Sequence, residues 1–112
     1  NRVLLIGLDG ADPALVEEGI AAGRLPNLAR LATGGTLVPC RSTTPCATFP
    51  AWTTCVTGVN PGRHGILDFT CMTPGTYALQ FVNASGRQAP ALWNVLSAAG
   101  KRGCVLGVPA NW

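Results

Sequence analysis

The side chains most able to do chemistry lie in the stretch 43–65, which carries six Thr residues, one Arg and one His but no carboxylate. So little charge is unusual in a surface loop, and it suits a hydroxyl that is held at the mouth of a pocket. We single out the hydroxyl of Thr48, because Phe49 and Pro50 follow it. Proline is favoured in the first turn of a helix, where the N–H group that it lacks would have no helical partner.

The sequence predicts a short helix over residues 51–57, ended by Gly58. Thr48 then lies near the N-cap, where backbone N–H groups and the positive end of the helix dipole favour an anion. Two interpretations are open at this point. Thr48 only caps the helix, as Thr often does, or its hydroxyl attacks an anionic substrate.

An alcohol is a weak nucleophile at neutral pH and needs a general base or a metal ion. A Thr–His–Asp arrangement would use His64, but a tight turn after the predicted helix separates His64 from Thr48. A metal-activated Thr48 with Asp9 as a metal ligand fits better, because oxygen ligands and phosphate substrates suit divalent ions. One carboxylate does not by itself make a metal site.

The elements that must position these residues follow from the apolar pattern. Residues 3–8 form a nearly continuous apolar run that is typical of a buried parallel strand. Asp9 would lie at the carboxyl end of this strand, where open α/β sheets bind ligands. Further strands are predicted over residues 36–41, 77–82 and 103–108, and further helices over residues 12–22, 25–34 and 91–99, whereas residues 70–76 are predicted to be a loop. This alternation predicts an α/β fold with a mostly parallel sheet flanked by helices.

The composition suggests one domain that is part of something larger. The chain has 112 residues, of which 47% are hydrophobic and 12% are charged. That charged share is about half the usual one, as expected for a piece whose faces are covered. The net charge of +3 comes from scattered basic residues, which argues against binding to a nucleic-acid duplex. No apolar run approaches the length of a membrane span.

The five Cys residues are odd in number and form no Cys-x-x-Cys pair, and with a single His they do not indicate a zinc finger. They are interpreted as free, buried thiols in a reducing compartment, which favours a cytoplasmic location.

Several short motifs occur together and in a fixed order. They are Val3-Leu4-Leu5-Ile6, Leu8-Asp9-Gly10, Leu25-Pro26-Asn27-Leu28, Thr48-Phe49-Pro50, Val56-Thr57-Gly58, Asn60-Pro61-Gly62-Arg63-His64-Gly65-Ile66, Pro90-Ala91-Leu92-Trp93 and Ala99-Gly100-Lys101-Arg102. With them the chain resembles the alkaline phosphatase superfamily over nearly its whole length. The closest resemblance is to the type I phosphodiesterase/nucleotide pyrophosphatase branch.

The resemblance implies an alkaline-phosphatase-like fold and a two-metal hydrolase of small phosphate esters, typically with zinc and with manganese as the alternative. Asp9 matches an Asp that binds one metal ion. Thr48 matches the nucleophile, which binds the same ion and forms a covalent phospho-enzyme intermediate. Such an ion pair would hold the attacking and leaving oxygens of an in-line displacement.

The match departs from the nucleotide pyrophosphatases at Phe69, which follows Asp68 where those enzymes have an Asn that helps to hold the phosphate. This favours a less characterised phosphohydrolase branch. His64 matches a His-Gly pair that is structural in the family, so it is not counted as a metal ligand. Asp68 and Arg63 are interpreted as turn residues.

The family draws its remaining Asp and His metal ligands from later sequence. We therefore expect residues 1–112 to be the N-terminal part of a single catalytic domain, inactive without the C-terminal part. The alternative is a noncatalytic α/β module that binds an anion at the start of the Thr48 helix.

Overall fold

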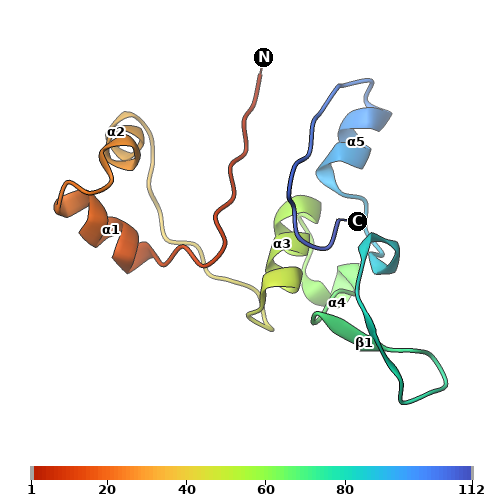
Figure 1. Cartoon of the computed structure of the whole chain (residues 1–112). Coiled ribbons are helices and arrows are strands. Elements are labelled where there is room, and N and C mark those ends of the chain that lie inside the picture. Colours follow the sequence, from red (N-terminus) through yellow and green to blue (C-terminus); the bar gives the residue numbers. More distant parts are fainter. Residues whose placement is uncertain (1, 112) are drawn as a thin grey trace. The chain divides into compact units, whose positions relative to one another are not determined.

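The structure is a computed structural model that describes residues 2–111 (Figure 1). The chain divides into two compact units, Asn1–Arg41 and Ser42–Trp112, here called unit 1 and unit 2. Each unit is described by itself.

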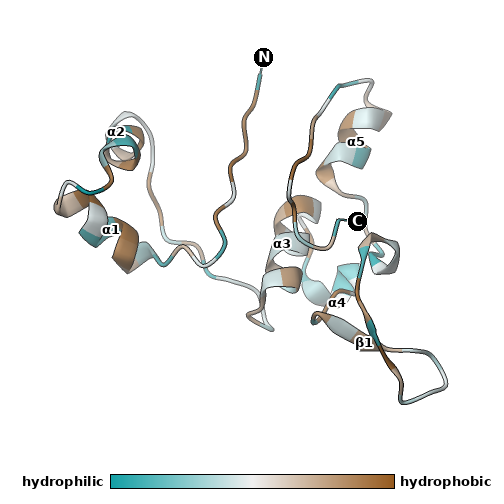
Figure 2. Cartoon of the chain, in the orientation of Figure 1, coloured by the Kyte–Doolittle hydropathy of each residue, from teal (hydrophilic) through white to brown (hydrophobic). Residues whose placement is uncertain are grey.

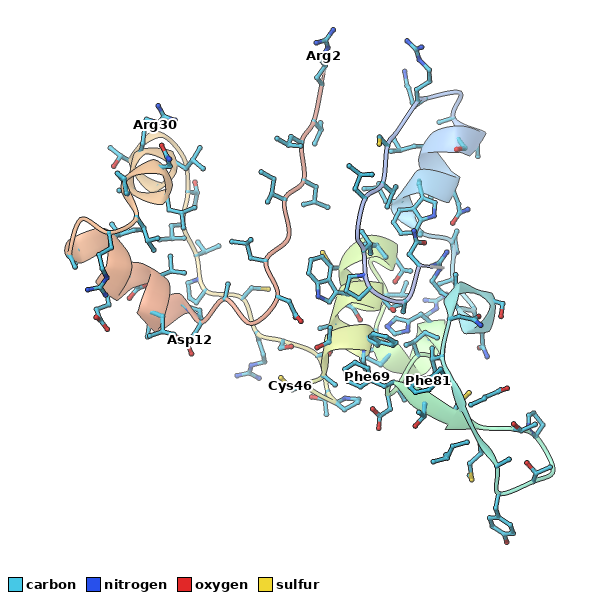
Figure 3. All side chains as sticks on the ribbon, viewed as in Figure 1. Arg2, Asp12, Arg30, Cys46, Phe69 and Phe81 are labelled. Carbon is cyan, nitrogen blue, oxygen red and sulfur yellow. The ribbon has the colours of Figure 1, made fainter. Side chains whose placement is uncertain are left out.

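Unit 1 holds an extended segment, a turn at Asp9 and Gly10, and two helices, α1 (Pro13–Ala21) and α2 (Pro26–Gly34). Both helices were predicted, because each begins with proline and ends near glycine. Asp12, labelled in Figure 3, is the N-cap of α1: its Oδ1 accepts hydrogen bonds from the backbone N–H groups of Ala14 at 2.7 Å and Leu15 at 3.3 Å. The carboxylate thus satisfies donors that have no partner within the helix.

The turn between α1 and α2 depends on Gly19, which is buried. A Cβ atom at this position would lie 2.6 Å from Cδ1 of Leu25, closer than carbon atoms approach one another. The carbonyl of Gly19 also accepts hydrogen bonds from the N–H groups of Arg24 and Leu25. Glycine therefore lets Leu25 pack directly on the backbone of α1.

Asp12→Ala is expected to destabilise α1 by about 1 kcal/mol, because two N–H groups lose their acceptor. The measurement is hydrogen exchange of the α1 amides, which should speed up several-fold. Asp12→Asn is the matched control, since Asn caps about as well as Asp. Equal exchange rates in Asp12→Ala and the wild type would contradict a capping role.

Unit 2 holds the remaining elements in the order α3, α4, β1, β2, a 3-10 turn and α5. Their bounds are α3 Thr48–Thr57, α4 Pro61–His64, β1 Thr70–Met72, β2 Leu79–Phe81, η1 Ala84–Gly86 and α5 Leu92–Ala98. Strands β1 and β2 pair antiparallel, with Thr70 opposite Phe81 and Met72 opposite Leu79. The strand predicted over residues 77–82 is confirmed as β2, whereas β1 lies in a segment that was predicted to be a loop.

The core of unit 2 is small. Phe49 of α3 packs with three buried residues from later in the chain, namely Ile66, Val82 and Ala110. The ring of Phe69, labelled in Figure 3, lies against the Phe49 ring with centroids 4.4 Å apart. The start of α3 is thereby attached to the hairpin and to the end of the chain.

The predicted parallel sheet is not formed among residues 2–111. Residues 3–8, 36–41 and 103–108 lie outside regular secondary structure, and the sheet that is present is the two-stranded antiparallel one. Figure 2 shows the hydrophobic character of residues 3–8, although Val3 is 92% exposed. A strand exists only through hydrogen bonds to a neighbouring strand, and these apolar segments have no such neighbour within their own units. The observed fold is a small α/β arrangement.

The prediction of buried cysteines is wrong. All five are exposed and none forms a disulfide. Cys40 and Cys104 lie on extended segments and Cys71 on a two-stranded hairpin, where no second layer covers them, and Cys55 lies in the wall of an open cleft beside α3. In residues 2–111 no helix has the length and apolar character needed to span a membrane.

Candidate active site at the start of α3

Helix α3 buries one side and ends sharply. Its buried residues recur with helical spacing and are Phe49, Pro50, Thr53 and Val56. Gly58 ends the helix in the left-handed conformation (φ 70°), and its N–H donates to the Thr54 carbonyl at 2.8 Å. Glycine adopts this conformation without the strain that a Cβ atom causes. The sequence therefore fixes both the buried side of α3 and its end.

Thr48 is the first residue of α3 and is half-buried. The helix begins three residues earlier than predicted, so Ala47, and not Thr48, occupies the N-cap position. Alanine has no polar side chain with which to cap. Phe49, directly after Thr48, is held in the core, which ties the first turn of the helix to the rest of unit 2.

Asp9 is exposed and lies in the turn that follows the extended residues 2–8 of unit 1. Gly10 after it has φ +65°, which lets the chain turn directly behind the carboxylate. Asp9 belongs to unit 1 and Thr48 to unit 2, and each is described by its surroundings within its own unit.

His64 is fully buried, with 0% of its surface exposed, and both of its ring nitrogens are engaged. Nδ1 lies 3.1 Å from the backbone N–H of Ile66, which donates to it. Nε2 lies 3.0 Å from Oγ1 of Thr54. Because Nδ1 accepts, the neutral ring carries its proton on Nε2 and donates it to Thr54. Both ring nitrogens thus form hydrogen bonds within the fold, as expected if His64 is a structural residue.

The surroundings of His64 hold its pKa below the ordinary value. Burial is the main cause, because it disfavours the charged form. The positive charge of Arg87 acts in the same direction, while the backbone of Pro50 favours the charged ring and raises the pKa. His64 is therefore neutral at pH 7.

The lowered pKa predicts that the folded chain loses stability in mild acid. The unfolded chain, whose His titrates near pH 6.5, binds a proton that the folded chain does not. The contribution of His64 is fully present above about pH 6.5 and is lost as the pH falls through the lower pKa of the folded state. Urea unfolding between pH 7.5 and 5.5 checks this, with His64→Gln, which cannot titrate, as the control. An equal pH slope in both proteins would contradict the prediction.

The fit of a metal ion can be judged from the acidic residues and His64. Asp12 caps α1, Glu18 forms a 2.8 Å salt bridge with Arg24, and Oδ1 of Asp68 accepts the Phe69 N–H at 2.7 Å. Among residues 2–111 no group of three or more His, Cys, Asp or Glu side chains could hold a metal ion. The oxygen donors of Asp9 and Thr48 are of the kind that divalent ions bind, but they are too few to complete a site.

Neither of two clefts in unit 2 coincides with the predicted site. The larger one, about 260 Å³, lies at the far end of α3 and beside α5, and its lining includes Thr57, Gly58 and Leu92. The smaller one, about 150 Å³, lies between the hairpin and η1, and its lining includes Cys71 and Ser85. We therefore locate the candidate site by Thr48, which was chosen for its chemistry and its position. The size of a cleft is not used for this purpose.

Comparison with known families gives a match over almost the whole chain. The model of the family described as Type I phosphodiesterase / nucleotide pyrophosphatase matches residues 3–111. The chain belongs to this family. The resemblance inferred from the short motifs is thereby confirmed at the level of the branch. Neither the curated proteins nor the solved structures gave a match.

Membership of the type I phosphodiesterase family makes this a chain of the phosphodiesterase/pyrophosphatase class of hydrolases, which act on phosphate esters. One residue near the site was missed by the sequence analysis, namely Thr54, the partner of His64. Six Thr residues crowd the stretch 43–65, and nothing in their order marks the one that faces the ring.

Proposed function

We propose that this chain carries the nucleophile of a metal-dependent phosphoester hydrolase, a phosphodiesterase or phosphatase, and that the nucleophile is Thr48. One observation carries the proposal: in a chain of the type I phosphodiesterase family, the hydroxyl residue of the Thr-Phe-Pro motif begins a ten-residue helix. The N-terminal turn of a helix presents backbone N–H groups and positive potential to an anion. A phosphoryl group bound there would lie beside the Thr48 hydroxyl.

The reaction would proceed in two displacements. Oγ1 of Thr48 attacks phosphorus as its proton leaves, the bond from phosphorus to the ester oxygen breaks, and the departing alkoxide takes up a proton. Water then attacks the phosphothreonine, releases phosphate or a phosphomonoester and returns the proton to Thr48. Covalent catalysis of this kind divides one difficult step into two easier ones.

Two divalent ions, zinc or else manganese, are proposed as cofactors, with Asp9 and Thr48 as ligands of one of them. Bound ions would supply Lewis acidity that lowers the pKa of a hydroxyl and neutralises phosphate charge. A tight zinc site needs about three or four protein ligands. We therefore propose that the other ligands come from sequence outside residues 1–112.

The same outside sequence is proposed to complete a mostly parallel sheet. The support is the exposure of apolar extended segments, such as Leu4 at 83% and Leu106 at 86%, which a sheet would cover. The unpaired cysteines support a reducing compartment, for which we propose the cytoplasm.

The test compares residues 1–112 with the complete reading frame that contains them, using a nitrophenyl phosphate ester. The complete protein is expected to turn the ester over, to lose activity with a chelator and to regain it with zinc. Residues 1–112 alone are expected to be silent, to bind zinc weakly and to self-associate in light scattering, because large apolar side chains are exposed.

Two results would count against the proposal. A stable monomer of residues 1–112 with metal-dependent turnover would refute the dependence on outside sequence. A complete protein that binds inorganic phosphate but turns over no ester would favour a noncatalytic anion-binding module.

A further inference from the structure

We propose that His64 is a positioning residue for Thr48: through Thr54 it holds the first two turns of α3 in the orientation from which the Thr48 hydroxyl attacks. The inference rests on the proposed function of Thr48. It concerns a side chain that would touch neither substrate nor metal.

The contacts of His64 join three segments of unit 2. The ring accepts the Ile66 N–H on one side and donates to Oγ1 of Thr54 on the other. Its backbone carbonyl accepts the N–H of Gln88 at 2.9 Å. Within unit 2 the residue therefore bridges α3, the chain after α4 and the segment before α5.

These contacts converge on the start of α3. Ile66, which binds the ring, packs in the same core cluster as Phe49, the residue next to Thr48. Helix α3 is thus held in its first turn by Phe49 in the core and in its second turn by the bond of Thr54 to the His64 ring. Rotation of α3 about its axis would break both attachments.

A bridge of this kind controls how the Thr48 hydroxyl is aligned for attack on the substrate. Loss of the Thr54 hydroxyl leaves the Nε2–H of the buried His64 ring without its acceptor, which costs about 1–3 kcal/mol of stability and lowers the melting temperature. A misplacement of about 1 Å at a nucleophile can in addition cost on the order of 100-fold in rate. The bridge is therefore expected to affect turnover as well as stability.

The decisive comparison is between two Thr→Val substitutions in the complete protein. Thr54→Val removes the hydroxyl that faces His64 and is expected to lower kcat at least about tenfold with little change in KM. Thr57→Val is the matched control in the same helix, because its hydroxyl donates to the Thr53 carbonyl at 2.6 Å, in the last turn. It is expected to lower the melting temperature and to leave kcat unchanged.

Conservative variants separate alignment from folding. Thr54→Ser keeps the hydroxyl and is expected to restore most of kcat. His64→Gln can place a donor near the Nε2 position, whereas His64→Asn can serve only near Nδ1. We expect His64→Gln to retain several-fold more kcat than His64→Asn at similar melting temperature. These variants keep the proposal testable if Thr54→Val does not fold.

The two proposals fail in different ways. If Thr48→Ala abolishes turnover but Thr54→Val and Thr57→Val have the same kcat, His64 is not a positioning residue and the function of Thr48 stands. If Thr48→Ala retains wild-type turnover, the nucleophile assignment fails and the positioning role is overturned with it.

Discussion

Thr48→Ala is expected to abolish turnover of a nitrophenyl phosphate ester by the complete protein, on the order of 10³-fold or more. The physical reason is that no oxygen remains at the start of α3 to form the bond to phosphorus. The fold should survive, because Ala is a strong helix former and Thr48 is not the N-cap residue of α3. A stopped-flow or steady-state assay at saturating substrate measures the effect on kcat.

Two controls make the Thr48 result specific. Thr48→Ser keeps a hydroxyl and is expected to retain substantial activity. Thr43→Ala makes the same chemical change in the preceding loop, where Oγ1 of Thr43 donates to the Pro45 carbonyl at 2.7 Å, and it should leave kcat within about twofold of the wild type. Turnover at the wild-type rate in Thr48→Ala would remove the nucleophile assignment.

The helices could be predicted from the sequence because local signals specify them. Asp12 starts α1 with a side-chain cap and Pro13 with a fixed backbone angle. Both signals can be recognised from the residue types alone. Gly58 ends α3 with φ of 70°, which glycine adopts most easily, whereas the four-residue α4 was predicted only as a turn. Each signal acts within a few residues and does not depend on distant parts of the chain.

Apart from β2, the strands could not be predicted in the same way, because a strand forms only where a second strand lies beside it. Residues 3–8 have the apolar run of a buried strand, yet within unit 1 they have no neighbouring strand and form none. Thr70 to Met72 has a weak pattern but is β1, because the chain reverses after it and brings β2 alongside. The apolar pattern shows that a segment is able to form a strand. Whether the strand forms depends on a second strand beside it.

The same distinction between local signals and packing applies to the candidate site. The motif around Thr48 was visible because its residues stand in a specific order, and the family match covers that stretch together with the rest of residues 3–111. The bridge from His64 to Thr54 was invisible because it depends on how α4 packs against α3. Adjacent Thr53 and Thr54 look alike in sequence, and only the packing assigns the ring to Thr54.

Asp9→Asn is expected to lower the metal content of the complete protein and to reduce its activity, partly recoverable with excess zinc or manganese. Asn keeps the shape of Asp but loses the negative charge, and a neutral amide oxygen is a much weaker ligand for a divalent ion. Elemental analysis after gel filtration measures the metal bound per chain, independently of turnover. The position supports the expectation: Asp9 is exposed in the turn that ends the extended residues 2–8.

Asp12→Asn is the matched control, three residues later in the same unit. The Asp12 carboxylate is already used, since its Oδ1 caps α1, and Asn can replace it as a cap. The control should therefore keep full metal content and activity. If Asp9 only stabilises its turn, Asp9→Asn would cost at most about 1 kcal/mol and leave the metal content unchanged. Unchanged metal in Asp9→Asn would thus rule out the ligand role, whereas a loss confined to Asp9→Asn would tie the proposed metal site to this one carboxylate.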